Sequence, residues 1–163
     1  MTVHSYAKVV IDALAQRHET LAIAESLTAG GLGHALTRIP GASAVFLGGV
    51  IAYSDSVKID VIGVTEKAIK EHTVVSEKVA QEMAQGVRAK FATTWGISTT
   101  GIAGPGDYQG IAAGTVWIAI VGPTSETLHL QLEGGRDQVR EGATPKPQNP
   151  SHSICYFNFE RDG

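Results

Sequence analysis

The stretch Leu21-Ala-Ile-Ala-Glu-Ser-Leu-Thr-Ala-Gly-Gly31 joins a short apolar segment to a helical pattern. Residues 21–24 predict a buried strand, and apolar residues then recur at helical spacing up to Ile39, before Pro40-Gly41 ends the pattern. Ser26 is therefore expected on a strand-to-helix turn, where its hydroxyl would face the carboxyl edge of a sheet.

The same alternation of strand and helix continues on both sides of this turn. Helices are expected over 5–17 behind a cap at Ser5, over 55–62 behind Ser54, over 65–72, and from Ser76 to about residue 91; strands are expected over 46–53, 95–100, 114–121 and 126–132. An apolar stripe from Val79 to Phe91 is typical of a helix packed on a core. Strands that alternate with helices and end in a hairpin predict a three-layer α/β/α domain with a mixed sheet.

Length and composition fit one small domain. The chain has 163 residues, 43% of them hydrophobic, which is enough to close a single core. A formal net charge of −3 gives no electrostatic support for binding nucleic acid or an anionic membrane. Cys155 is the single cysteine, and no apolar run approaches the ~20 residues that span a bilayer, so a reducing cytoplasmic location is expected.

The domain is expected to occupy residues 1–143, followed by an irregular tail over 144–163. Thr144-Pro-Lys-Pro-Gln-Asn-Pro150 holds three prolines, which would stop any helix that begins near Asp137.

Ser26 is the first candidate for chemistry. Hydrolysis of an amide requires a nucleophile, a base and donors for the oxyanion. The first N–H groups of the following helix, at Thr28, Ala29 and Gly30, are expected to face an anion. The alternative from position alone is that Ser26 only caps the helix.

Tyr53 and Lys58 form the second candidate. Both follow a predicted strand, five residues apart in Tyr53-Ser-Asp-Ser-Val-Lys58, and both can reach the same sheet edge. A lysine whose neutral amine is favoured by burial serves as the base for a serine in some hydrolases. The alternative is an ordinary solvated helix lysine beside a half-buried tyrosine.

A glycine-rich loop follows the strand at 95–100. Its small residues Thr100, Gly101, Ala103 and Gly104 allow a ligand close to the backbone and offer donors to a phosphate or ribose. No Gly-Lys-Ser/Thr follows, so it is not a Walker A motif. The six histidines lack metal-ligand spacing, so neither a metal nor a cofactor is expected.

Seven motifs in this order resemble those of the CinA C-terminal domain family, the competence-damage-inducible proteins, over about residues 5–140. They are Ala24-Glu-Ser-Leu-Thr-Ala-Gly30, Ile39-Pro-Gly-Ala-Ser43, Tyr53-Ser-Asp-Ser-Val-Lys58, residues 72–77, Thr100-Gly-Ile-Ala-Gly-Pro-Gly106, Gly114-Thr-Val-Trp117 and Gly135-Arg-Asp-Gln-Val-Arg140.

The resemblance implies a fold, a reaction and a role for each candidate residue. Stand-alone family members are nicotinamide mononucleotide deamidases with an anticodon-binding-domain-like α/β/α fold, and they use a serine, a tyrosine and a lysine without a metal. Ser26 would be the nucleophile, Lys58 the base, and Tyr53 the group that orients or relays the proton. Arg140 and Arg136 would hold the substrate phosphate. A homodimer is also expected from the resemblance.

Three departures from the family pattern carry expectations of their own. Leu27 and Ala29 stand where the family usually has cysteine and glycine, so a positive φ at Ala29 would add strain of ~1 kcal/mol or more. The loop after Gly106 is shorter than usual, and proline-rich sequence replaces the family's C-terminal helix beyond Arg140.

Two other functions stay open from the sequence. One is a non-catalytic module that binds a nucleotide or a partner in competence and recombination. The other is an amidase for a different small carboxamide.

Overall fold

A computed structural model describes residues 3–144 of the chain, which form one α/β domain. Its elements, in chain order, are α1 (Val3–Gln16), β1 (Leu21–Glu25), α2 (Gly31–Thr37), the 3₁₀ turn η1 (Ala42–Ala44), β2 (Phe46–Ile51), α3 (Asp55–Ile62), α4 (Glu66–His72), α5 (Glu77–Phe91), β3 (Trp95–Gly101), β4 (Thr115–Val121), β5 (Ser125–Gln131) and α6 (Arg136–Gly142). The expected tail over 144–163 lies outside the described residues, apart from Thr144.

The five strands form one mixed sheet in the order β2-β1-β3-β4-β5. The central strand β1 is parallel to β2 and β3, whereas β3–β4 and β4–β5 pair antiparallel. The carboxyl ends of the three parallel strands therefore meet at one edge of the sheet. All five residues of β1 are buried, as expected for a strand covered on both faces.

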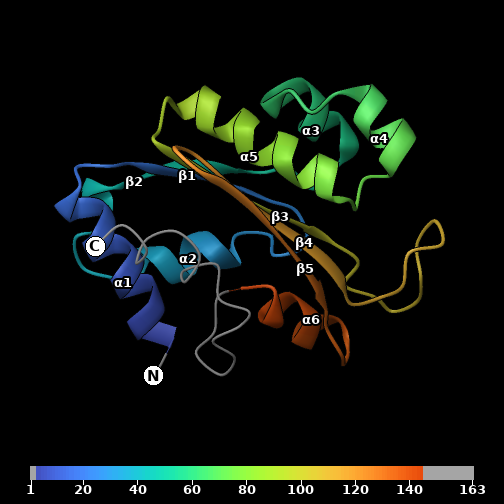
Figure 1. Ribbon diagram of the computed structural model, residues 1–163. Coiled ribbons are helices and arrows are strands. Elements are labelled where there is room, and N and C mark those ends of the chain that lie inside the picture. The colour runs from blue at the N-terminus through green and yellow to red at the C-terminus, as the bar shows by residue number, and fades with distance from the viewer. Residues whose placement is uncertain (1–2, 145–163) are drawn as a thin grey trace.

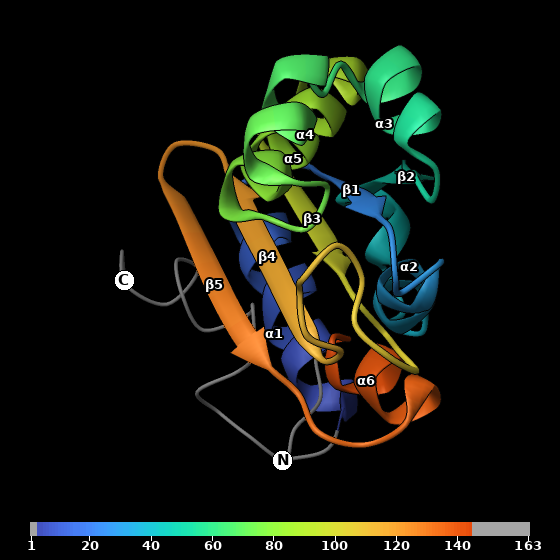
Figure 2. The same cartoon turned by 90° about the vertical axis from the view of Figure 1, so that its right-hand side faces the viewer.

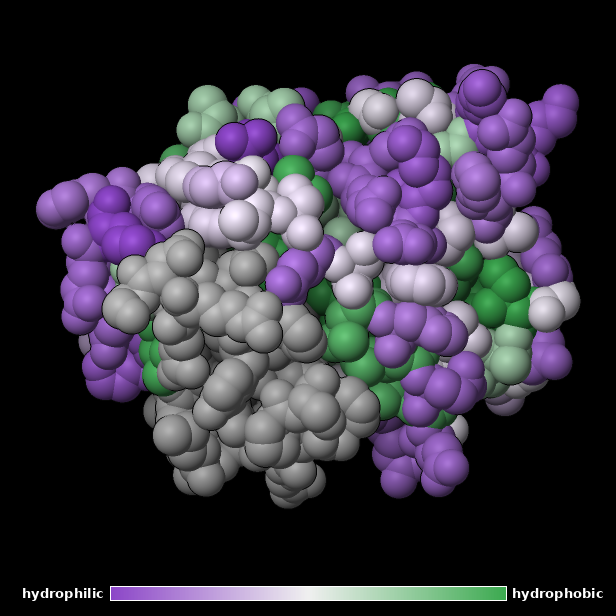
Figure 3. All heavy atoms as spheres, in the orientation of Figure 1, coloured by the Kyte–Doolittle hydropathy of each residue, from purple (hydrophilic) through white to green (hydrophobic). Residues whose placement is uncertain are grey.

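Helices cover both faces of the sheet, which confirms the predicted three-layer α/β/α fold (Figure 1). Helices α3, α4 and α5 lie on one face, and α1, α2 and α6 lie on the other. The predicted stripe on α5 is its buried side, since Val79, Met83 and Val87 are each 0% exposed. Hydrophilic residues cover much of the outer surface around α4 (Figure 3).

Polar caps set where the helices of the first layer begin. The side chains of Ser54, Thr65 and Ser76 accept hydrogen bonds from the backbone N–H groups of Val57, Ala68 and Val79, which confirms the predicted caps at Ser54 and Ser76. The cap at Ser54 begins α3 and so places Lys58 one turn inside that helix.

Several predicted boundaries were wrong by a few residues. Helix α1 begins at Val3, so Ser5 lies inside it; β2 ends at Ile51, two residues before Tyr53; and α4 begins after Thr65. Apolar periodicity identifies an element but does not locate its first or last turn.

Candidate active site

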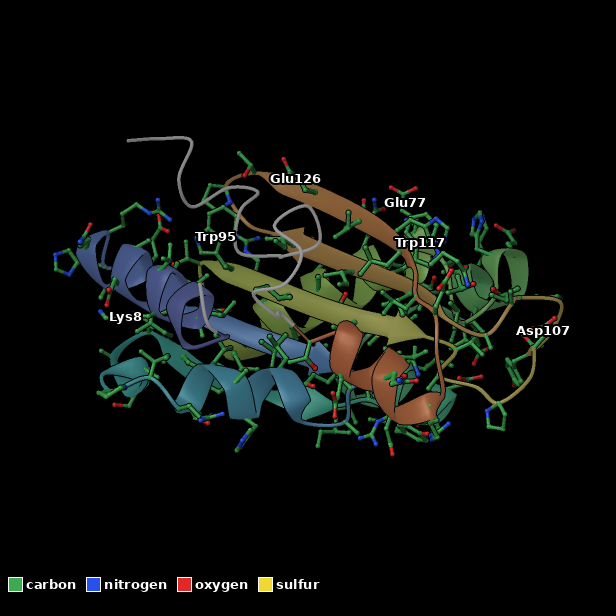
Figure 4. The ribbon with its side chains drawn as sticks, turned by 90° about the horizontal axis from the view of Figure 1, so that it is seen from below. Lys8, Glu77, Trp95, Asp107, Trp117 and Glu126 are labelled. Carbon is green, nitrogen blue, oxygen red and sulfur yellow. The ribbon has the colours of Figure 1, made fainter. Side chains whose placement is uncertain are left out.

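A cleft of about 370 Å³ opens at the edge where β1, β2 and β3 end. Figure 2 shows this edge, with the β3–β4 loop beside α6. Five segments line the cleft: Ser26 and Leu27, then Tyr53, Asp55 and Lys58, then Val74 and Val75, then the loop 100–108, and Arg136. The loop projects away from the sheet at Asp107, at the opposite end from Trp95 (Figure 4). Some of these lining residues were predicted from the sequence, and others were not.

Ser26 and Lys58 meet at the floor of the cleft. The Lys58 Nζ atom lies 3.3 Å from Ser26 Oγ and 3.3 Å from the carbonyl oxygen of Tyr53. Lys58 is only 1% exposed, so it is not the solvated helix lysine of the alternative interpretation. The arrangement places an amine within proton-transfer distance of a serine hydroxyl.

Burial changes the proton affinity of Lys58. Desolvation lowers the pKa of its ammonium below 10.5, and the carboxylate of Asp55 partly offsets this by raising it. Loss of solvation disfavours the charged form of a lysine. The neutral amine, which can accept a proton, is therefore present at a lower pH than in an exposed lysine.

Glu25 holds the turn that carries Ser26. Its carboxylate is 1% exposed and accepts hydrogen bonds from the N–H groups of Gly30, Leu32 and Gly33 at 2.8 to 3.0 Å. These N–H groups belong to the start of α2, where a carboxylate is favoured by the helix dipole. Ser26 is thus fixed between a paired strand and a capped helix.

The expected anion site at Thr28, Ala29 and Gly30 was largely wrong. Gly30 donates its N–H to Glu25, and Ala29 donates to the carbonyl oxygen of Ser26 at 3.1 Å. None of the three residues lines the cleft. The Glu25 carboxylate accepts a hydrogen bond from an N–H group that was expected to face a ligand.

Two other N–H groups remain at this turn. Within residues 3–144, the backbone N–H groups of Leu27 and Thr28 donate to no protein acceptor. Leu27 directly follows Ser26 and lines the cleft. An N–H in that position suits an oxyanion that forms when the serine attacks a carbonyl. The Thr28 side chain is instead held inside the protein, 2.8 Å from the hydroxyl of Thr99.

Ala29 has a left-handed backbone with φ of 47°, which is the condition under which strain was expected at this position. This region costs an alanine about 1 kcal/mol relative to glycine. The turn keeps its shape in spite of that strain because Glu25 and the β1–β3 pairing hold both of its ends.

Tyr53 and Arg136 meet at the mouth of the cleft. Arg136 donates from Nη2 to the Tyr53 hydroxyl oxygen and from Nη1 to the carbonyl oxygen of Gly104, both at 2.8 Å. Tyr53 is 57% exposed, more than the half-buried sheet residue of the alternative interpretation. Its backbone carbonyl, and not its hydroxyl, is the group that contacts Lys58.

Arg140 does not reach the cleft, contrary to the expectation that it would hold a substrate phosphate there. Its Nε donates to the carbonyl oxygen of Leu27 at 2.9 Å, and its side chain lines a separate depression with Thr28 and Asp137. Arg140 lies one turn after Arg136 on α6, and of the two arginines only Arg136 lines the cleft. Arg140 instead supports the Ser26 turn from outside.

The glycine-rich loop lies where the sequence placed it. Thr100, Gly101, Ala103 and Gly104 all line the cleft, although the Thr100 hydroxyl donates to the carbonyl oxygen of Val74 at 3.0 Å. Their part in binding a substrate stays a prediction.

Sequence reasoning missed the structural role of Glu25 and the electrostatic role of Asp55. Capping rules search the residue directly before a helix, whereas Glu25 lies six residues before Gly31, the first residue of α2. A helix was expected from residue 55, but no role was expected for Asp55, which lies in the first turn of α3. Its effect on Lys58 depends on burial that no local pattern reveals.

Fold and cleft together define a class: a three-layer α/β/α protein with a serine and a buried lysine at the carboxyl edge of its sheet. The model of the CinA C-terminal domain matches residues 3–147, and the chain belongs to this family. No helix among residues 3–144 is long and apolar enough to cross a membrane.

Sequence relatives support the assignment to the CinA family. The chain is 50% identical over 140 residues to a CinA-like protein of Cyanothece sp., covering 83% of this chain and 34% of that protein. A CinA-like protein of Thermosynechococcus vestitus is 43% identical over 139 residues, covering 82% and 33%. The chain thus spans about a third of the length of these relatives.

Solved structures match nearly the whole chain. Competence damage-inducible protein A of Klebsiella pneumoniae superposes with a TM-score of 0.84 and 33% identity, covering 88% of this chain and 90% of that one. A CinA superfamily protein of Enterobacter cloacae gives a TM-score of 0.85 and 32% identity, covering 88% and 86%.

Proposed function

We propose that this domain is a serine amidohydrolase that converts nicotinamide mononucleotide to nicotinic acid mononucleotide and ammonia. The observation that carries the proposal is the contact of Lys58 Nζ with Ser26 Oγ at 3.3 Å, made by a lysine that is 1% exposed. A buried amine beside a hydroxyl is the pairing that activates serine in hydrolases without a histidine.

The first half of the reaction forms an acyl-enzyme. Ser26 Oγ attacks the carboxamide carbon while its proton passes to the neutral Lys58 amine. The carbonyl oxygen becomes an oxyanion that accepts a hydrogen bond from the Leu27 N–H. The intermediate collapses, the carbon–nitrogen bond breaks, and the proton held by Lys58 passes to the departing nitrogen, which leaves as ammonia.

The second half removes the acyl group. Water attacks the ester carbon and gives a proton to Lys58, which returns it to Ser26 Oγ as the ester bond breaks. The products are the free carboxylic acid and the starting enzyme. Lys58 thus alternates between base and acid, which requires a pKa near the working pH. The lowered pKa of Lys58 supports that role.

The shape and polarity of the cleft support a nucleotide-sized substrate. Its volume of about 370 Å³ lies within the ~300–1,000 Å³ usual for small-molecule sites. The loop 100–108 offers close backbone approach, and Arg136 offers a guanidinium at the mouth. Guanidinium groups pair well with phosphate.

Ammonia release from nicotinamide mononucleotide by the purified protein tests this proposal. We expect turnover in the wild type, and near-complete loss in Ser26→Ala with nucleotide binding retained. Ser56→Ala is a matched control, because Ser56 is exposed and does not line the cleft. Wild-type turnover in Ser26→Ala would contradict the nucleophile assignment.

Two results would redirect the proposal. Release of ammonia from another small carboxamide, but not from the mononucleotide, would keep the chemistry and change the substrate. Nucleotide binding without release from any carboxamide would favour a binding module. Association into a homodimer is a separate proposal, which the sedimentation coefficient of the purified chain would test.

A further inference from the structure

Arg136 connects three parts of the cleft mouth. It is the first residue of α6, and its two terminal nitrogens donate to the Tyr53 hydroxyl and to the Gly104 carbonyl, each at 2.8 Å. The guanidinium therefore links α6, the β2–α3 connection and the glycine-rich loop. Both of its acceptors are neutral oxygens, which are weaker partners than an anion.

The bond to Tyr53 restricts what its hydroxyl can do. A phenol oxygen has one proton to donate and a limited capacity to accept. Arg136 uses part of that capacity, while Lys58 contacts only the backbone carbonyl of Tyr53. In this arrangement the Tyr53 hydroxyl is engaged at the mouth and not at Ser26.

Charge in the cleft directs an anion to Arg136. Among the described lining residues, Lys58 and Arg136 are basic, and Asp55 and Asp107 are acidic. Lys58 is buried at the floor, and the two aspartates repel an anion elsewhere. A phosphate that enters the cleft therefore meets Arg136 first, and it competes directly with Tyr53 and Gly104 for the guanidinium.

We propose that Arg136 makes a phosphate group on the substrate a condition for full turnover. The phosphate takes the guanidinium away from Tyr53 and Gly104, and the freed Tyr53 hydroxyl turns toward the reacting groups. This inference rests on the proposed function and gives the phosphate monoester of its substrate a role in turnover. Inorganic phosphate then activates a substrate that lacks one.

A binding experiment tests the exchange without relying on turnover. The protein is labelled with ¹³C at the ring Cζ of tyrosine, the Tyr53 signal is assigned with Tyr53→Phe, and inorganic phosphate is titrated. We expect the Tyr53 signal to shift with saturation in the wild type and to stay fixed in Arg136→Gln. Arg38→Gln is the matched control, because Arg38 is exposed and does not line the cleft; it should respond as the wild type does.

A kinetic experiment tests the consequence. Nicotinamide riboside, which lacks the phosphate, should be deamidated about 10- to 100-fold more slowly than the mononucleotide, as expected for loss of a charged hydrogen bond. Added inorganic phosphate should raise kcat for the riboside in the wild type and in Arg38→Gln, but not in Arg136→Gln. If the glutamine variant does not fold, Arg136→Lys replaces it, since a lysine cannot bridge both acceptors.

The outcomes separate this inference from the proposed function. A wild-type Tyr53 signal that ignores saturating phosphate would overturn the exchange, whatever the activity. Turnover of the mononucleotide with no phosphate activation of the riboside would overturn it too, because phosphate would then only tether the substrate. Absence of turnover with a shifting Tyr53 signal would reject the deamidase and keep the exchange.

Discussion

Glu25 and Lys58 are the two charged side chains that are buried among the described residues, and both flank Ser26. Three backbone N–H groups surround the carboxylate at 2.8 to 3.0 Å. The amine has two contacts, both at 3.3 Å. Hydrogen bonds offset the cost of burying a polar group, whereas desolvation lowers the pKa of Lys58 and favours its neutral amine. One side of Ser26 is therefore built for stability, and the other for proton transfer.

The largest expected effect is on turnover through Lys58. Lys58→Met should lower kcat/KM for the mononucleotide by about 10²–10⁴-fold, the usual contribution of a general base. Lys58→Arg should not restore it, because a guanidinium keeps its proton. Ammonia release measures both. Turnover in Lys58→Met within a few-fold of the wild type would show that Lys58 is not the base for Ser26.

Lys58→Met should at the same time make the domain more stable at neutral pH. The pKa of Lys58 is lower in the folded state than the unfolded value of 10.5. The unfolded chain therefore binds more protons between those pKa values, so the lysine destabilises the fold as the pH falls below 10.5. The gain on substitution should vanish above that pH. Urea unfolding at pH 7 and pH 11 tests the sign.

Glu25→Gln should have the opposite effect to Lys58→Met: it should lower the stability of the domain and change turnover little. The amide puts an NH₂ donor among three N–H donors, which should lower the free energy of unfolding by about 3 kcal/mol. The fraction that stays folded should still release ammonia. Glu66→Gln is a suitable control, since Glu66 is exposed at the start of α4. A Glu25→Gln variant that is stable but inactive would show that Glu25 takes part in the reaction.

Asp55→Asn should shift the pH profile without removing activity. The Asp55 carboxylate raises the pKa of Lys58, so its loss should lower that pKa further. The rise of kcat/KM with pH should then occur at lower pH than in the wild type. Asp60→Asn, an exposed change on the same helix, should leave the profile in place. A shift to higher pH would contradict the assignment of Lys58 as the base.

The smallest effect is expected at Ala29, on the structural side. Ala29→Gly should raise the free energy of unfolding by about 1 kcal/mol, because φ is 47° there and glycine adopts that region without strain. Thermal unfolding measures the gain. An equal loss of stability would show that backbone entropy outweighs strain at this turn.

Local patterns were enough to predict most of this fold. Caps such as Ser54 and Ser76 act within a few residues of themselves, and the stripe on α5 reflects one buried face, so both are visible in the sequence. The turn at Ser26 was predicted for the same reason. The extent of α1 and β2 was not, because pairing and packing with distant segments decide where an element ends.

The site was less predictable because it joins distant segments. The sequence placed Ser26 and Lys58 at one edge, but not that Glu25 would occupy the helix donors or that Arg140 would lie outside the cleft. Those outcomes depend on how α2 and α6 pack, which spacing along the chain does not encode. The Arg136–Tyr53 bond likewise connects residues 83 positions apart.

Direct titration of Lys58 tests whether this amine is the base for Ser26. In protein labelled with ¹³C and ¹⁵N at lysine, with Lys58→Met to assign the signal, the side-chain shifts of Lys58 report its protonation as the pH changes. We expect a pKa of Lys58 clearly below 10.5 that coincides with the pKa in the kcat/KM profile for nicotinamide mononucleotide. A Lys58 that titrates like an exposed lysine, or at a pH unrelated to the kinetic profile, would contradict it.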